Sequence, residues 1–190
     1  MIFRSLLAAA AAAVVAGPAA AAAAPSQPLE FQGVALGTPL QAWLQRPLDD
    51  PGRPGLRAVC RRSAGAAAAT VCRYVGRYGA VTVGESFPLA GRYRARNVAY
   101  RFVGGRLAEV DFSTSADAFN LMMARLKQRY GQPAQVVRGT ASYGHGVRLP
   151  RVRVVWRLPA GEVELTDPSA DPGRMAVRLR GASVQARTAS

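Results

Sequence analysis

The segment NVAYRFVGGRLAEVDF, residues 97–112, decides the fold, because it has the pattern of a β-hairpin. Two stretches of alternating apolar residues flank Gly104, Gly105 and Arg106, and three residues are an accepted length for a hairpin loop. A hairpin with this loop predicts an antiparallel sheet as the framework of the protein.

The register set by this loop matches side chains by character on both faces. It pairs Val98 with Phe112, Tyr100 with Val110, and Phe102 with Ala108 on one face. On the opposite face it places Arg101 across from Glu109. Apolar residues facing apolar ones, with a positive charge facing a negative one, are what a correct register gives. The hairpin therefore predicts one buried face and one polar face.

A second hairpin is predicted in RVRVVWRLPAGEVELT, residues 151–166. A four-residue loop at 158–161 pairs Trp156 with Val163, Val154 with Leu165, and Arg157 with Glu162. The segment RMAVRLR, residues 174–180, alternates in the same way. It points Met175, Val177 and Leu179 inward and Arg178 and Arg180 outward. Both segments extend the predicted sheet.

The segment STSADAFNLMMARLKQRYGQP, residues 113–133, predicts the main helix. Thr114 and Asp117 match the capping-box pattern, with Asp in place of the commoner Glu. Gly131 and Pro133 end the helix. One apolar stripe is formed by Phe119, Met122, Met123, Leu126 and Tyr130. Such a stripe can hold a ligand, but its more common role is to pack on a sheet.

The segment GTPLQAWLQRP, residues 37–47, predicts a short helix. Thr38 is its expected N-cap, Pro39 its first helical residue and Pro47 its end. Its apolar face consists of Leu40, Trp43 and Leu44.

The rest of the chain carries weaker patterns. Residues 29–37 are apolar enough for a strand, and residues 70–83 predict two short strands. Residues 57–70 are predicted to be irregular, and residues 138–149 to be a mobile loop, because neither segment is periodic.

Together these elements predict an α+β fold. We expect an antiparallel sheet of several strands, covered on one face by one long and one short helix as a two-layer sandwich. The domain organisation is a cleaved signal peptide over residues 1–24, a single α+β domain over 25–181, and a disordered tail over 182–190.

The chain begins with the pattern of a secretory signal. Arg4 precedes an apolar run of 11 residues, Leu6 to Ala16, and small residues lead to a cleavage position after Ala22 to Ala24. A bilayer needs about 20 apolar residues, so this run is too short to span one. The alternative is an uncleaved anchor over residues 2–24. Export favours a soluble protein that is periplasmic or secreted.

The two cysteines, Cys60 and Cys72, are predicted to form a disulfide in an oxidising compartment. A metal site is the alternative, but zinc takes three or four Cys or His ligands and the chain has one histidine, His145. We therefore expect no metal and no cofactor.

The net charge of +14, from 25 Lys and Arg against 11 Asp and Glu, favours anionic partners. All the basic residues except Lys127 are arginines. The alternative is that this composition reflects a GC-rich genome and that the charges only solvate the surface. Nucleic acid is not an expected partner of an exported protein.

Catalytic patterns are weak. His145 lies in YGHG with no acidic residue nearby, and Ser86 in GESFP lacks the second glycine of a nucleophile elbow. The remaining acidic candidates are Glu109 with Asp111 and Glu162 with Glu164. Glu109 and Glu162 face arginines in the predicted registers, which favours a structural role. There is no dinucleotide-binding or P-loop motif. We predict that the protein is not an enzyme.

Arginines dominate the predicted outer face of the sheet. The candidate ligand-binding residues are Arg101, Arg151, Arg153, Arg157, Arg178 and Arg180. Several arginines on a rigid surface can hold phosphate groups bidentately. Acidic residues on the same face offset part of this charge, and the absence of aromatic residues there argues against stacking on bases.

The block VAYRFVGGRLAEVDFSTSADAFNLMMARLKQRYGQP, residues 98–133, followed by a strand with Trp156, resembles a pattern in small exported bacterial proteins of unknown function. The opening GVALGTPLQAW, residues 33–43, is similar to their first strand and helix. A looser likeness is to small envelope proteins that assist outer-membrane β-barrel assembly. The chain lacks their lipid-bearing cysteine, and its long helix lies between hairpins instead of before the sheet. Neither likeness implies a catalytic residue.

The sequence thus predicts a non-enzymatic binding module of the bacterial cell envelope. Its ligand would be an anionic envelope component, bound through the basic sheet face or residues 138–149. The alternative is a secreted inhibitor or accessory protein that docks on another protein. A third reading is an enzyme that uses His145 or a glutamate pair.

Overall fold

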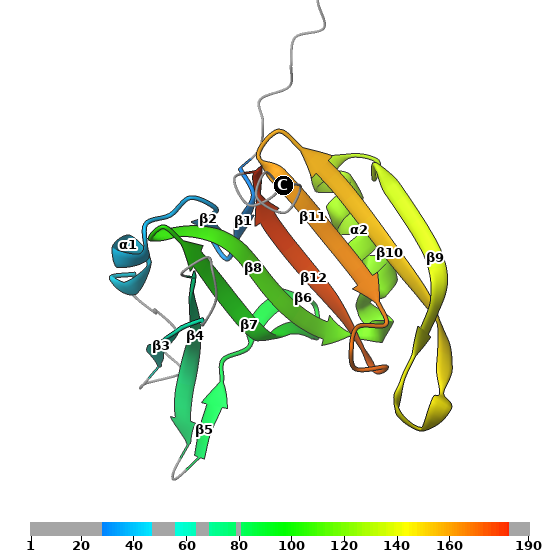
Figure 1. Cartoon of the computed structure of the whole chain (residues 1–190), viewed down its shortest axis with the longest axis horizontal. Coiled ribbons are helices and arrows are strands. Elements are labelled where there is room, and N and C mark those ends of the chain that lie inside the picture. The colour runs from blue at the N-terminus through cyan, green and yellow to red at the C-terminus, as the bar shows by residue number, and fades with distance from the viewer. Residues whose placement is uncertain (1–27, 47–55, 64–68, 79–80, 183–190) are drawn as a thin grey trace, which may run out of the picture.

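A computed structural model describes residues 28–46, 56–63, 69–78 and 81–182. The predicted signal peptide and residues 183–190 of the predicted tail lie outside the described residues. Figure 1 shows a strongly twisted sheet with one helix, α2 (Phe119–Tyr130), lying across one face of its C-terminal strands. We call the opposite face of the sheet the outer face.

The described strands are all antiparallel to their neighbours. They are β1 Glu30–Phe31, β2 Val34–Ala35, β3 Arg57–Arg62, β4 Ala69–Tyr78, β5 Val81–Gly84, β6 Phe87–Ala90, β7 Tyr93–Val103, β8 Arg106–Ser115, β9 Gln135–Ser142, β10 Arg148–Leu158, β11 Gly161–Asp167 and β12 Arg174–Gly181. The main sheet has the order β3-β4-β7-β8-β12-β11-β10-β9, with β5 paired to β4 and β6 to β7. β1 and β2 pair only with each other.

One continuous core lies on the inner face of this sheet. At the C-terminal side, Met122 and Leu126 of α2 cover β10, β11 and β12. At the other side, Trp43 is fully buried, and its ring stacks on Tyr74 with the centroids 4.4 Å apart. Phe31 of β1 lies between these two parts, 4.7 Å from the Phe112 ring. The core therefore runs across the sheet from β4 to β10.

Both predicted hairpins are confirmed. Tyr100 pairs with Val110 and Arg101 with Glu109, while the second hairpin has every predicted pair. The first loop is shorter than expected, because Gly104 and Gly105 form a two-residue turn with φ values of 58° and 74°. A bulge after Arg101 absorbs the difference, so that Phe102 pairs with Leu107 and not with Ala108. The alternation of 174–180 is also confirmed in β12.

The predicted two-layer α+β sandwich is wrong. The protein is mostly antiparallel sheet, and only one helix in the described part of the chain, α2 with the 3-10 turn Ala116–Ala118 (η1), is long enough to cover a sheet face. The short helix α1 (Leu40–Leu44) has five residues and buries only Trp43. A helical pattern over so few residues indicates a short turn that anchors one side chain. Such a turn is too short to cover a face of the sheet.

The start of the main helix also differs from the prediction. Thr114 is not a capping residue, because it lies in β8 and pairs with Met175 of β12. The chain leaves the sheet only after Ser115, and neither η1 nor α2 has a side-chain cap. The Gly131 stop is confirmed by its φ of 80°.

Two segments expected to be irregular are edge strands. Residues 57–62 form β3, and most of 138–149 belongs to the hairpin of β9 and β10. Neither edge strand has a buried face, so neither shows a regular alternation of apolar and polar residues in its sequence.

Thr38 is not the N-cap of α1, contrary to the prediction. Its hydroxyl donates to the Ala35 carbonyl at 2.7 Å, and the N-cap is Pro39.

Candidate functional site

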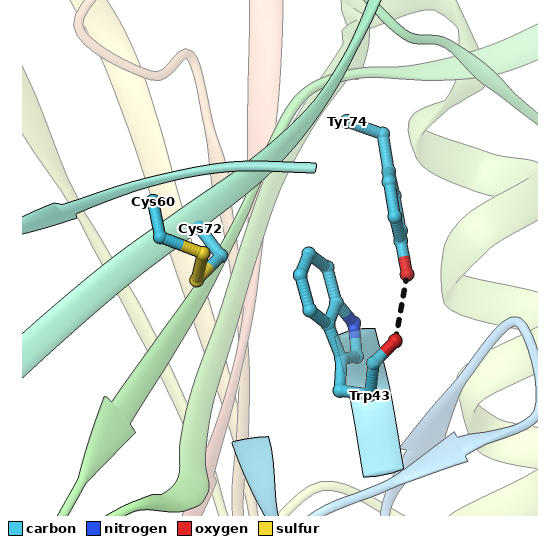
Figure 2. Close-up of a disulfide and its surroundings, with 4 residues drawn as sticks. All are labelled: Trp43, Cys60, Cys72 and Tyr74. Atoms are coloured by element: carbon cyan, nitrogen blue, oxygen red, sulfur yellow. Dashed lines mark hydrogen bonds between the residues drawn. A yellow bond between two sulfur atoms is a disulfide. The ribbon is translucent and has the colours of Figure 1, made fainter. Parts of the chain in front are cut away.

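The predicted disulfide between Cys60 and Cys72 is present and joins β3 to β4 (Figure 2). The two residues are direct partners across the strands, with their Cα atoms 4.0 Å apart. Beside them, the Tyr74 hydroxyl donates to the Trp43 carbonyl at 3.5 Å (Figure 2). Burial raises the pKa of this phenol to about 12. The disulfide thus fixes an edge strand next to the aromatic part of the core.

All six arginines of the predicted site lie on the outer face, and five of them have acidic neighbours there. One row of cross-strand partners consists of Arg101, Glu109, Arg180, Glu162 and Arg157, from β7, β8, β12, β11 and β10. We call this row the charge ladder. Its successive N–O distances are 3.5, 3.0, 3.8 and 3.9 Å. Positive and negative side chains therefore alternate across five strands.

A second row of charges runs beside the ladder. Arg178 of β12 bridges Asp111 and Glu109, and Arg153 of β10 contacts Glu164 at 2.7 Å. The hydroxyl of Thr166 also donates to Glu164, at 3.0 Å. Burial opposes ionisation of Glu164, but these hydrogen bonds and the Arg153 charge outweigh it and lower the pKa.

Glu109 and Asp111 share this surface with opposite pKa shifts. Burial, a hydrogen bond with Glu109 and the negative charge of Glu109 raise the pKa of Asp111 to about 6. Burial also opposes ionisation of Glu109, but hydrogen bonds from Asp111 and Arg180 and the charge of Arg178 outweigh it and lower its pKa. Of the two carboxyl groups, Asp111 is therefore the one that holds a proton in mildly acidic solution.

These contacts change what the outer face can do. Five of the six arginines already hold carboxylates, while Arg151 forms no ion pair with a described residue. Arg153 and Arg157 keep 45% and 62% of their side chains exposed, so they are the paired arginines most open to a ligand. The outer face is therefore a network of ion pairs more than a purely basic surface.

A crevice between α2 and the inner face of the sheet has the form of a small-molecule site. Its volume is about 430 Å³. The apolar lining comes from Phe31, Leu89, Phe112, Met122, Leu126, Val163, Val177 and Leu179. Small-molecule pockets usually enclose roughly 300–1,000 Å³ and are mostly apolar with a few polar groups. This crevice is not predicted by the sequence, although the methionine-bearing stripe of α2 is a signal for it.

The rim of the crevice is charged. Arg129 of α2 forms an ion pair with Glu30 of β1 at 3.0 Å. Arg125, one turn earlier, donates to the Leu89 carbonyl at 2.9 Å and meets no acidic group among the described residues. Arg129 also lies over the ring of Tyr130, and burial raises the pKa of that phenol. Of the two rim arginines, Arg125 is therefore the one whose charge is not paired with a described acidic residue.

Other predicted chemistries find little support in the described residues. His145 lies in the short turn Gly144–Gly146 between β9 and β10. No group of three or more His, Cys, Asp or Glu side chains that could hold a metal ion occurs among the residues that the structure covers. Within those same residues, no helix is both long and apolar enough to cross a membrane.

Comparison with protein-family models, curated proteins and solved structures finds no match to this chain. The resemblance to small exported bacterial proteins therefore stays a prediction.

Proposed function

We propose that this protein is a non-enzymatic binding module of the bacterial cell envelope that holds an anionic amphiphile in the crevice under α2. The apolar end of the ligand lies against Phe112, Met122 and Leu126, and its acidic group meets Arg125 at the rim. The observation that carries the proposal is an apolar crevice of about 430 Å³ with an arginine at its rim that no described acid neutralises.

The location in the envelope is supported by the disulfide. Bonds of this kind persist in oxidising compartments such as the periplasm and are rare in the cytosol. The predicted signal peptide agrees with this location. Amphiphiles with acidic groups are abundant where membranes are, so the ligand class fits the compartment.

Calorimetric titration with dodecanoate, a carboxylate with an apolar tail, tests the site. Leu89 is partly buried at the wall of the crevice, and Leu89→Trp fills the space, so affinity should fall about tenfold or more. The control is Leu121→Trp, because Leu121 is 37% exposed on α2 and does not line the crevice. That variant should bind as the wild type does.

A second pair of variants tests the acidic group. Arg125→Glu reverses the charge at the rim, whereas Lys127→Glu makes the same net change on the same helix outside the crevice. Only the first should weaken dodecanoate binding, by about tenfold. Absence of saturable binding, or equal losses in both members of either pair, would rule out the crevice as the site.

Binding of anionic polymers or lipid surfaces through the outer face stays a prediction. The exposed side chains of Arg153 and Arg157 favour it, although each holds a glutamate. Sedimentation with anionic vesicles measures it directly. Vesicle binding that falls steeply with salt and is lost in Arg153→Glu/Arg157→Glu supports the face, and unchanged binding in that variant eliminates it.

A further inference from the structure

A second cavity, of about 260 Å³, opens where β7 parts from β8. The β7–β8 register ends at Arg96 paired with Ser113, and residues 93–95 pair with β6 instead. Asn97, with a φ of 54°, marks the irregularity at which β7 changes direction. The ends of the two strands are therefore separated by a notch, which the chain at Gly173 and Arg174 borders on its third side.

Four arginines line this notch. They are Arg92, Arg94, Arg96 and Arg174. No carboxylate is among the described residues that line it. The positive charges of these side chains lie around one small cavity and repel each other. The arrangement is explained if the cavity receives an anion.

Two of the four side chains, Arg94 and Arg174, are held in position by hydrogen bonds to neighbouring serines. Arg94 donates through Nε to the Ser86 hydroxyl at 2.9 Å and through Nη2 to the Ser86 carbonyl at 2.6 Å. Arg174 donates through Nε to the Ser113 hydroxyl at 3.2 Å. Each guanidinium keeps further N–H groups for a ligand, because arginine has five donors and these bonds use one or two. A preorganised arginine loses less entropy when it binds.

Arg92 contributes less than the others. Its side chain is 79% exposed and forms an ion pair with Asp117 at 2.9 Å. The charges of Arg94, Arg96 and Arg174 have no such acidic partner among the described residues. These three groups come from two strands on opposite sides of the notch, so their N–H groups reach an anion from more than one direction.

We propose that this notch binds a phosphate group. A tetrahedral phosphate offers oxygens in several directions and carries up to two negative charges, whereas a carboxylate offers two oxygens in one plane. Arginine is the side chain best suited to phosphate, since its planar donors bond two oxygens at once. The phosphate belongs either to a small soluble molecule or to a lipid headgroup, and both present the same chemistry to the arginines.

The first experiment is a titration of the full chain with inorganic phosphate in low salt, followed by backbone amide NMR. Shifts should concentrate at residues 92–96, 114–115 and 173–174. Arg96→Ala/Arg174→Ala should weaken binding about tenfold or more. The control, Arg138→Ala/Arg148→Ala, removes the same charge from exposed positions outside the notch and should keep wild-type affinity.

Vesicles containing phosphatidic acid distinguish the two sources of phosphate. Binding that is lost in the notch variant, kept in the control, and displaced by inorganic phosphate assigns a lipid headgroup. Binding of phosphate in solution without any such vesicle effect assigns a soluble ligand. Equal losses in the two double variants, or phosphate shifts that avoid the notch, overturn the proposal. Leu89→Trp lies in the other cavity and should leave phosphate binding unchanged, so the two proposals fail separately.

Discussion

The side chain of Asp111 is half-buried between Arg178 and Glu109, and this environment makes its carboxyl group a weaker acid. Its pKa of about 6 lies above the ordinary value of 3.8, so the folded protein holds a proton there that the unfolded chain has released. This contribution to stability is complete below pH 3.8 and is lost as the pH rises through about 6.

Asp111→Asn should therefore have a pH-dependent effect on the free energy of unfolding. Near pH 4 the variant should match the wild type, because Asn resembles protonated Asp. Near pH 7 it should gain about 3 kcal/mol relative to the wild type. Urea denaturation at both pH values measures this difference. A constant offset between the two proteins would contradict the assignment.

Glu164→Gln provides the contrast of opposite sign. The pKa of Glu164 is lowered, so its contribution is present above the ordinary value of 4.5 and is lost as the pH falls. This variant should be less stable than the wild type near pH 7 and approach it in acid.

Thr114 carries a buried hydroxyl without a described hydrogen-bond partner. It is 1% exposed, and its Oγ1 meets no donor or acceptor among the residues that the structure covers. Removing an unsatisfied buried polar group while keeping its shape stabilises a protein. Thr114→Val should raise the free energy of unfolding by about 1 kcal/mol.

Thr166→Val is the matched control for Thr114→Val. Thr166 is 4% exposed on the neighbouring part of the sheet, but its hydroxyl bonds to Glu164 at 3.0 Å. This variant should lose stability. Guanidinium denaturation of both proteins checks the pair, and a loss in Thr114→Val would show that its hydroxyl does have a partner.

At the scale of elements, β12 is the centre of the ion-pair network. Arg180 is 29% exposed and contacts both Glu109 and Glu162, so Arg180→Met would leave two poorly exposed carboxylates without that partner. We expect a loss of about 1–3 kcal/mol. Arg157→Met should cost less than about 0.5 kcal/mol, because Arg157 is 62% exposed and 3.9 Å from its glutamate. Thermal unfolding ranks the two, and equal losses would argue against the ladder.

The elements that sequence reasoning predicted correctly have local pairing. In both hairpins a short turn fixes which residues meet, and apolar or charged pairs confirm the register within about 16 residues of sequence. β3 and β9 were missed because edge strands exposed on both faces carry no burial period. Thr114 was misread because Ser, Thr and Asp before an apolar run suit a strand end as well as a helix start.

The charge pattern of the outer face depends on the pairing of β12 with β8, which no local sequence pattern predicts. That Arg178 and Arg180 point outward was predictable, and so was the placement of Glu109 and Glu162. The position of β12 beside β8 was not predictable, because the residues that pair between these two strands are about 60 to 70 apart in the sequence. Because β12 lies between β8 and β11, the arginines of the predicted basic sheet face alternate with carboxylates in ion pairs. The crevice and the notch likewise arise from how distant elements meet.

At the scale of the whole molecule, we predict that the protein isolated from its source has lost the predicted signal peptide by cleavage after one of residues 22–24. We also predict that Cys60 and Cys72 are oxidised to a disulfide. Intact-mass spectrometry of the protein isolated from its source measures both. A full-length chain with both cysteines reduced would contradict export to an oxidising compartment.

Cys60→Ala/Cys72→Ala should destabilise the protein. The disulfide closes a loop with a sequence separation of 12 residues, and releasing such a loop costs about 3 kcal/mol. Hydrogen exchange should speed up most in β3, the edge strand that the bond holds. An even increase over the whole sheet would show a wider role.

The charges of the outer face have one more consequence. Each central strand presents a single sign there: β7, β12 and β10 are positive, and β8 and β11 are negative. A misassembled sheet with β8 beside β11 would align carboxylates, and one with β10 beside β12 would align guanidiniums, which is unfavourable. The alternation of apolar residues determines which face of a strand is buried, whereas the sign of its outer charges determines which neighbouring strands are favourable. The charges of the outer face thus disfavour strand orders that place like signs side by side.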